Sequence, residues 1–311
     1  IVLLIFKLYF TYARQPSPFG NTNILRKSVR QRLAFSFTKK GKKSRLDIMY
    51  KLRSRPILKY LIFVYVLVIV SIVATYFKYP ATVANTYKLL GEKSFLVLHR
   101  NNLALKFLGM SRDKNLGLGN EDFETYFLLG RVYFVENNLS ESIKNYTKAI
   151  ELNPDFKENY YGRGLAYGFA SPIFYTNAEE DFKKYIDIDN ANFKNTGRHA
   201  YGAWAGYNDL SWIYFLEGDF ENSEIAARDG LKISGSNPWL KNMLGTALLA
   251  QKKCDEAKDY LEDAKKLIQD TTSKEFGEAY SGDKPELWAV GKKQMENTII
   301  ENLKTCEENS H

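Results

Sequence analysis

The stretch FETYFLLGRVYFVENNLSESIKNYTKAIELNP, residues 123–154, decides how the rest of the chain is interpreted. Apolar and small residues recur at helical spacing in its first half, and the same spacing returns after the break at residues 137–138. Each half therefore predicts a short amphipathic helix. Gly130 and Ala149 are small enough to let the two helices approach closely, and Pro154 ends the second helix. The stretch predicts a helical hairpin.

The hairpin pattern returns three times, at a period of about 34 residues. A lone hairpin cannot bury its own apolar face, so recurrence at a fixed period indicates stacked repeats. The second copy departs from the pattern at Arg163 and carries an insertion around Pro172, the third has Gly230 inside its second helix, and the fourth has Lys241 in place of the opening aromatic residue. The recurring positions are Tyr126, Gly130, Tyr133, Ser142, Tyr146 and Ala149; Tyr160, Gly164, Tyr167, Ala178 and Phe182; Tyr207, Leu210, Ser211, Tyr214, Ser223 and Ala227; and Leu244, Gly245, Ala257, Leu261 and Ala264.

Over residues 123–269 this pattern closely resembles the tetratricopeptide repeat (TPR). The resemblance implies an all-α fold in which about four helix-turn-helix repeats stack into a solenoid. It also implies that the first helix of each repeat lines a concave groove. The glycines at the repeat period are expected to serve close helix packing and not ligand binding.

Two other segments accompany the repeats. Residues 191–203 are expected to form an irregular loop on one face of the solenoid. Residues 270–311 are expected to form a C-terminal linker and a capping helix that covers the exposed face of the last repeat. Proline suits the first turn of that helix, and an apolar stripe follows at Leu287, Val290, Ile299 and Leu303.

An uncharged run of 18 residues, YLIFVYVLVIVSIVATYF, occupies residues 60–77. With its flanking residues it reaches the roughly 20 residues that cross a bilayer, so residues 57–79 predict a transmembrane helix in contact with lipid. A buried core helix is one alternative, but the β-branched residues surround this helix on all faces. A cleaved signal peptide is the other, although the small-residue cleavage site around residues 81–84 is poor.

The basic residues around this run are unevenly distributed. Eight precede it within about 20 positions and three follow it, which predicts a cytoplasmic N-terminus and repeats in a periplasm or on a cell surface. The eight are Lys39, Lys40, Lys42, Lys43, Arg45, Lys51, Arg53 and Arg55, and the three are Lys78, Lys88 and Lys93.

The first 56 residues are interpreted as a basic cytoplasmic segment. Met49 is a candidate for the true start, in which case residues 1–48 are not translated. The apolar residues 1–10 are alternatively the end of an earlier span. Residues 80–122 are interpreted as a juxtamembrane linker, with amphipathic helices expected at residues 83–90 and 95–107.

Charge placement argues against nucleic acid as a partner. Residues 1–56 carry a net charge of +13 and the rest of the chain −5, although the whole chain is at +8. The repeats therefore lack the basic excess that neutralises phosphates.

No residue pattern indicates catalysis, a metal or another cofactor. His99, His199 and His311 are far apart in sequence, and the acidic run at residues 179–181 is more typical of a solvated helix face. The chain is therefore expected not to be an enzyme. Cys254 and Cys306 are the only cysteines, and the sequence leaves open whether they pair.

The groove residues follow from carrying the family's concave positions onto this chain. A clamp for a terminal carboxylate is not expected, because few basic or amide residues occupy these positions. An apolar or helical segment is the expected ligand, and the alternative is that a helix of the same chain fills the groove. The predicted peptide-binding residues are Phe127, Arg131, Phe134, Tyr161, Phe169, Asn208, Trp212, Phe215, Trp239 and Asn242.

These observations predict a single-pass, membrane-anchored TPR scaffold that binds proteins or peptides outside the cytoplasm. The resemblance suggests a role in assembling an envelope or secretion complex. The alternative is an accessory subunit of a cell-envelope enzyme that acts on glycan or peptidoglycan.

Overall fold

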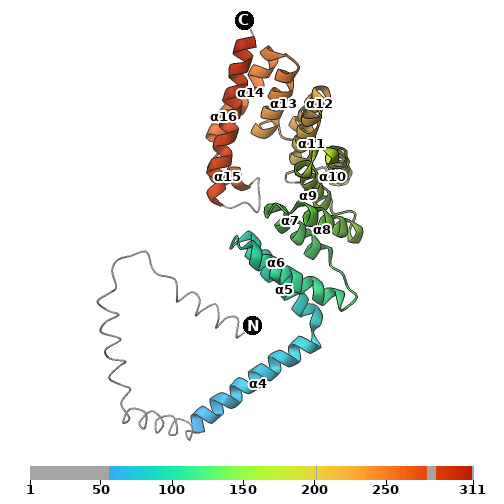
Figure 1. Cartoon of the computed structure of the whole chain (residues 1–311), viewed down its shortest axis with the longest axis vertical. Coiled ribbons are helices and arrows are strands. Elements are labelled where there is room, and N and C mark those ends of the chain that lie inside the picture. Colours follow the sequence, from blue (N-terminus) through green and yellow to red (C-terminus); the bar gives the residue numbers. More distant parts are fainter. Residues whose placement is uncertain (1–55, 201, 279–284, 310–311) are drawn as a thin grey trace, which may run out of the picture. The chain divides into compact units, whose positions relative to one another are not determined.

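The computed structural model describes residues 56–200, 202–278 and 285–309. Regular secondary structure within these ranges is helical throughout (Figure 1). The chain divides into two units, residues 1–75 and 76–311. The expectations about residues 1–55, including the basic segment, Met49 as the start and the earlier span, lie outside the described residues.

Helix α4, Pro56–Lys78, occupies the predicted transmembrane segment almost residue for residue. The stretch Tyr60–Lys78 is long and apolar enough to cross a membrane, and none of it is buried. A core helix of a soluble protein would have its apolar side chains buried, so the exposure of this helix fits a lipid-facing role better. It is the one such helix among the described residues.

The predicted linker begins with a packed helical hairpin formed by α5, Pro80–Leu96, and α6, Asn101–Leu116. A Cβ atom at Gly91 would lie 2.6 Å from Cγ of Leu108, so the two helices are in close contact. Leu108 shares a hydrophobic cluster with Leu129 and Val132 of the first repeat. The hairpin thus extends the stack of helices, which the interpretation as a linker did not include.

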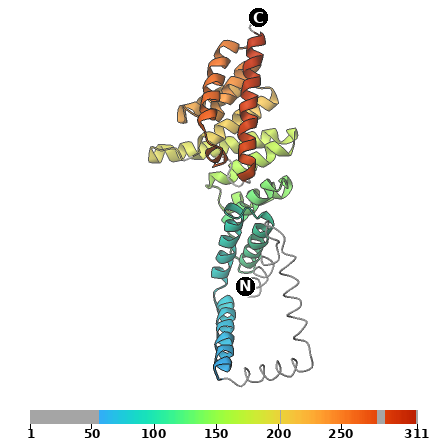
Figure 2. The same cartoon turned by 90° about the vertical axis from the view of Figure 1, so that its left-hand side faces the viewer.

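Four further hairpins follow in order along the chain (Figures 1 and 2). Neighbouring helices pack against each other, which confirms the predicted helical repeats. The helices are α7, Phe123–Val135, and α8, Leu139–Leu152; α9, Lys157–Ala170, and α10, Tyr175–Thr196; α11, Trp204–Glu217, and α12, Phe220–Ile233; and α13, Pro238–Ala250, and α14, Cys254–Asp270.

The turn inside a repeat is set by one residue in the left-handed region. Asn137, Gly218 and Lys252 have φ values of 56°, 80° and 62° at equivalent places in three of the repeats. Glycine and asparagine adopt this conformation at low cost, whereas lysine does so with strain. Asn138 then caps α8 by accepting a hydrogen bond from the Glu141 N–H at 3.3 Å.

Small residues make the seam between the paired helices. A Cβ atom at Gly130 would lie 2.9 Å from the Tyr146 ring, and one at Gly164 would lie 3.0 Å from the Phe182 ring. Such distances leave no room for a larger side chain, so these glycines occupy packing positions. In the third repeat Ser211 takes the place of the glycine, and its hydroxyl donates to the Ser223 carbonyl at 2.8 Å.

Arg163, which departs from the repeat pattern, has a specific partner. Its guanidinium donates to both carboxylate oxygens of Asp181, each at 2.8 Å, and to the Thr147 hydroxyl at 3.2 Å. The aliphatic contact usual at this place in the repeat is replaced by a bidentate ion pair between α9 and α10.

The expected loop at residues 191–203 is shorter than predicted, because α10 continues to Thr196 and Gly197 ends it with a φ of 69°. The buried Asp189 carboxylate holds the remaining loop. It accepts from Lys157 Nζ at 2.6 Å, from the Ala200 N–H at 3.2 Å and lies 2.7 Å from His199 Nδ1. The insertion around Pro172 forms a short 3₁₀ helix, Pro172–Phe174.

The C-terminal segment contains α15, Ser273–Glu278, and α16, Pro285–Asn309. Helix α16 packs on α14 and α13, with Ile299 and Leu303 buried as predicted. Leu287 and Val290, which were expected on the same packed stripe, are half exposed. Cys254 and the buried Cys306 are free thiols in one hydrophobic cluster, and burial raises the pKa of Cys306 to about 11.

Candidate functional site

A cavity of about 820 Å³ runs along the first helices of the repeats. Its walls come from α7, α9, α11 and α13, and α16 with Phe276 of α15 lines it as well. The groove expected from the repeat pattern is therefore present, and the last helix of the chain forms part of its wall.

Nine of the ten predicted peptide-binding residues line this cavity. They are Phe127, Arg131, Phe134, Tyr161, Phe169, Asn208, Trp212, Trp239 and Asn242. The exception is Phe215, whose ring packs on Phe220 at 5.4 Å between centroids and does not reach the cavity. Its position on α11 is three residues beyond Trp212, so the helix turns it away from the groove.

Aromatic rings form a nearly continuous surface along the groove. The Phe169 ring lies 5.8 Å from Phe134 and 5.1 Å from Trp212, centroid to centroid. Further along, Trp239 lies 5.3 Å from Trp204 and 5.6 Å from Phe276. Phe169 is 59% exposed, so much of this apolar surface is open to a ligand.

The Asp209 carboxylate is the main polar group of the groove. It accepts a hydrogen bond from the Tyr161 hydroxyl at 2.7 Å and another from Asn208 Nδ2 at 3.0 Å. Burial raises the pKa of Asp209 to about 6, against the opposing effect of these two hydrogen bonds. At neutral pH the group is therefore mostly ionised, and a fall in pH through 6 protonates it.

Three polar atoms on the cavity lining are buried and have no hydrogen-bond partner in the structure. They are the amide oxygens of Asn208 and Asn242 and the indole nitrogen of Trp288. An unpaired buried polar group costs on the order of 1–3 kcal/mol, so it is uncommon without a functional reason. Each of these atoms is able to hydrogen-bond to a molecule in the groove.

Arg131 lies at the α7 end of the lining, with its guanidinium 5.2 Å from the Phe95 ring and 5.6 Å from the Phe127 ring. Burial lowers the pKa of Arg131. The guanidinium is thus held against aromatic faces, which is typical of a cation–π contact.

Helix α16 contributes the lining residues that the sequence did not predict. Leu287, Trp288 and Met295 face the cavity from this helix, and Gly277 of α15 provides the space in which the Trp288 indole sits. The apolar stripe of α16 was a detectable signal, but it was assigned to capping alone. The expectation that a helix of the same chain fills the groove is replaced by one in which α16 lines it and leaves the cavity beside it.

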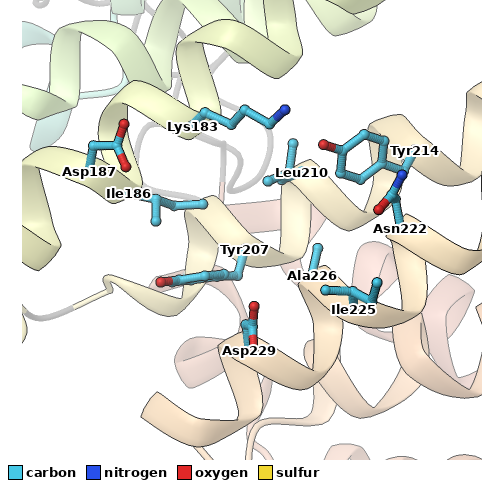
Figure 3. Close-up of a pocket in the computed structure, with 10 residues that line it drawn as sticks. All are labelled: Lys183, Ile186, Asp187, Tyr207, Leu210, Tyr214, Asn222, Ile225, Ala226 and Asp229. Atoms are coloured by element: carbon cyan, nitrogen blue, oxygen red, sulfur yellow. The ribbon is translucent and has the colours of Figure 1, made fainter.

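A second, smaller pocket of about 170 Å³ lies among α10, α11 and α12 (Figure 3). Its polar groups are largely committed to neighbours in the fold. The Tyr214 hydroxyl donates to Glu179 at 3.0 Å, and Asp229 pairs with Lys232 at 2.5 Å. The larger groove is therefore the better candidate for a binding site.

Among the described residues, no group of three or more histidine, cysteine or acidic side chains is placed to hold a metal ion. His99 lies at a left-handed turn between α5 and α6, whereas His199 contacts Asp189. The acids at residues 179–181 are likewise separated in role, since Glu179 accepts from Tyr214 and Asp181 pairs with Arg163.

Comparisons with known proteins agree with this architecture. Residues 120–168 match the family model described as a TPR repeat. A curated relative, the UDP-N-acetylglucosamine–peptide N-acetylglucosaminyltransferase of Giardia intestinalis, is 32% identical over 108 residues, which is 35% of this chain. The match spans only 7% of that relative's length.

Solved structures show the same fold. MamA 41-end from Desulfovibrio magneticus RS-1 has a TM-score of 0.51 at 15% identity, covering 60% of this chain and 97% of that one. Pseudomonas aeruginosa pilF has a TM-score of 0.50 at 11% identity, covering 74% of this chain and 90% of that one. Repeated hairpins with small residues at their seams, a matching family model and this shared fold identify the chain as a tetratricopeptide-repeat protein.

Proposed function

We propose that the chain is a membrane-anchored scaffold whose TPR groove binds an apolar or helical segment of another protein. The observation that carries this proposal is the open aromatic surface formed by Phe169 and its neighbours along a cavity of about 820 Å³. Rigid aromatic rings in a concave site supply much of the binding energy in protein interfaces. The unpaired amides would fix the direction of the bound segment.

Capture of partners by the full chain, purified in a mild detergent, tests this proposal. The double variant Phe169→Ala plus Trp212→Ala removes the central part of the aromatic surface. Phe215→Ala is its matched control, because this aromatic residue lies on the same helix as Trp212 and outside the cavity.

We expect the double variant to lose partner capture by at least about tenfold and the control to retain it. Circular dichroism should show similar helicity in all three proteins. Equal capture by the double variant would contradict binding in the groove.

We further propose that α4 anchors the chain, with residue 56 in the cytoplasm and the repeats outside it. The proposal is supported by the length and exposure of the helix and by the excess of basic residues before it. A protease added to intact cells or spheroplasts should then digest the repeats. Protection of the repeats until the inner membrane is lysed would contradict this orientation.

In this proposal the chain itself performs no reaction and helps assemble an envelope or secretion complex. A second candidate is an accessory role beside an enzyme that acts on glycan or peptidoglycan, and the glycosyltransferase name of the Giardia relative favours it. Co-purification separates the two. Stable association with an active glycan enzyme would support the accessory role, whereas association with secreted or assembling client proteins would support the scaffold.

A further inference from the structure

The part of the groove between α9 and α11 is rich in hydrogen-bond acceptors. Asp209 of α11 and Glu158 of α9 both line the cavity, and Glu158 forms no ion pair with a described residue. Because Asn208 turns its NH₂ group toward the Asp209 carboxylate, its amide oxygen is free to accept a further hydrogen bond. Three acceptor groups therefore converge on this part of the cavity.

The two carboxylates share one neighbourhood. Burial raises the pKa of Tyr185, and the charges of Glu158, Asp189 and Asp209 add to that effect. The Tyr185 ring lies 5.2 Å from the ring of Tyr161, which is the residue that donates to Asp209. Asp189 does not contribute to the cavity, because it is already paired with Lys157 at 2.6 Å.

The charge lining the cavity is negative overall. Its charged residues are Arg131, Glu158 and Asp209, and Arg131 is held at the α7 end against the rings of Phe95 and Phe127. No basic lining residue therefore comes from α9 or α11 among the described residues. Tyr161 and Trp212 place aromatic faces beside the carboxylates, and such faces attract a cation through their quadrupole.

Building on the proposed function, we propose that the peptide bound in this groove carries a lysine or arginine side chain, and that Asp209 and Glu158 receive its positive charge. Tyr161, Trp212 and the amide oxygen of Asn208 complete the site. Apolar residues on either side of the basic residue would pack on the remaining aromatic surface. The carboxylates would thus select the position of one basic residue within an otherwise apolar segment.

Selection from a random library of displayed peptides, each about a dozen residues long, tests this proposal with the full chain in nonionic detergent. Peptides retained at about pH 7.5 should be enriched in lysine or arginine next to apolar residues. Replacing that basic residue by norleucine in a recovered peptide should weaken binding on the order of tenfold, as measured by fluorescence anisotropy.

Charge variants locate the effect. Asp209→Asn and Glu158→Gln should each reduce the preference for a basic residue, whereas Glu221→Gln, which removes an exposed carboxylate on α12, should leave it unchanged. Thermal melts establish that each variant is folded, and if Asp209→Asn fails to fold, the matched pair of glutamate variants decides the outcome.

The pH dependence provides a second readout. Protonation of Asp209 as the pH falls through about 6 should weaken binding of the basic peptide, and this loss should be smaller in Asp209→Asn. Lys157, Glu158, Tyr161, Tyr185 and Asp189 are the other ionisable groups around this part of α9 to α11.

Recovery of apolar peptides without a basic residue, or an unchanged lysine preference in both Asp209→Asn and Glu158→Gln, would overturn this inference alone and leave peptide binding in place. If no peptide is retained by the wild-type protein while it remains folded, the proposed function itself fails, and this inference fails with it.

Discussion

The seams between paired helices and the wall of the groove lie on different faces of the same first helices, and they treat polar groups in opposite ways. In the seams, the Ser142 hydroxyl donates to the Gly130 carbonyl at 2.9 Å, and Ser211 and Ser223 each donate to the other's carbonyl at 2.8 Å. On the groove side, the buried amide oxygens of Asn208 and Asn242 have no partner.

This difference separates residues that build the fold from residues that remain available for recognition. A buried hydrogen bond in a seam offsets the desolvation of both groups, whereas an unpaired amide oxygen in the groove keeps that cost until a ligand arrives. Substitutions in the seams should therefore change the free energy of unfolding, and substitutions in the groove should mainly change binding.

The largest effect on stability is expected where a seam contains an ion pair. Asp181→Ala leaves the Arg163 guanidinium without its bidentate partner, in a position where the Asp181 side chain is only 5% exposed. We expect a loss of about 3 kcal/mol in the free energy of unfolding, measured by urea denaturation. Adding Arg163→Leu should recover part of this loss, because it restores the apolar residue usual in the repeat; a further loss would contradict the explanation.

A somewhat smaller effect is expected from a seam glycine. Gly164→Leu places a side chain against the Phe182 ring and should cost about 1–3 kcal/mol by overpacking. Gly109→Leu on α6 is the matched control, because no atom lies within 4 Å of a Cβ placed there. Similar thermal melts for the two variants would count against the assigned packing.

The buried Asp189 makes stability depend on pH at the edge of the second repeat. Burial alone would raise the pKa of Asp189, but hydrogen bonds from Lys157, His199 and the Ala200 N–H outweigh it and lower the pKa. A lowered pKa stabilises the fold above the ordinary value near 3.8, and that contribution is lost as the pH falls further.

Asp189→Asn should therefore cost about 1–2 kcal/mol at neutral pH, and its difference from the wild type should shrink below about pH 4. Chemical denaturation at a series of pH values measures this change. A difference that stays constant into that acidic range would show that the charge of Asp189 does not contribute.

The smallest effect on stability is expected on the groove wall. Asn242→Leu removes a buried amide oxygen that has no partner, so the free energy of unfolding should change by less than about 0.5 kcal/mol. Ser211→Ala, a comparable loss of a polar group in a seam, should cost about 1 kcal/mol because the Ser223 groups lose their partner. A larger loss from the groove variant than from the seam variant would break the comparison.

The repeat register was predictable because it depends on local periodicity. The positions of Gly130, Gly164 and Gly245 repeat at a fixed interval, and their large partners lie within the same hairpin. The hairpin of α5 and α6 was missed because its spacing to the next repeat is irregular, although Gly91 and Leu108 make the same kind of contact. Phe215 was misplaced because a family position carried across by number ignores the rotation of a single helix turn.

By itself, the sequence determined the helical hairpins, the stacking order and the apolar helix α4, since these follow from periodicity, small residues and uncharged length. Only the tertiary structure decided that α16 lines the groove with Trp288 and that the Tyr161 hydroxyl meets Asp209, 48 residues further along the chain. These contacts join different helical hairpins, and the geometry that brings such distant residues together depends on how every intervening helix packs on the next.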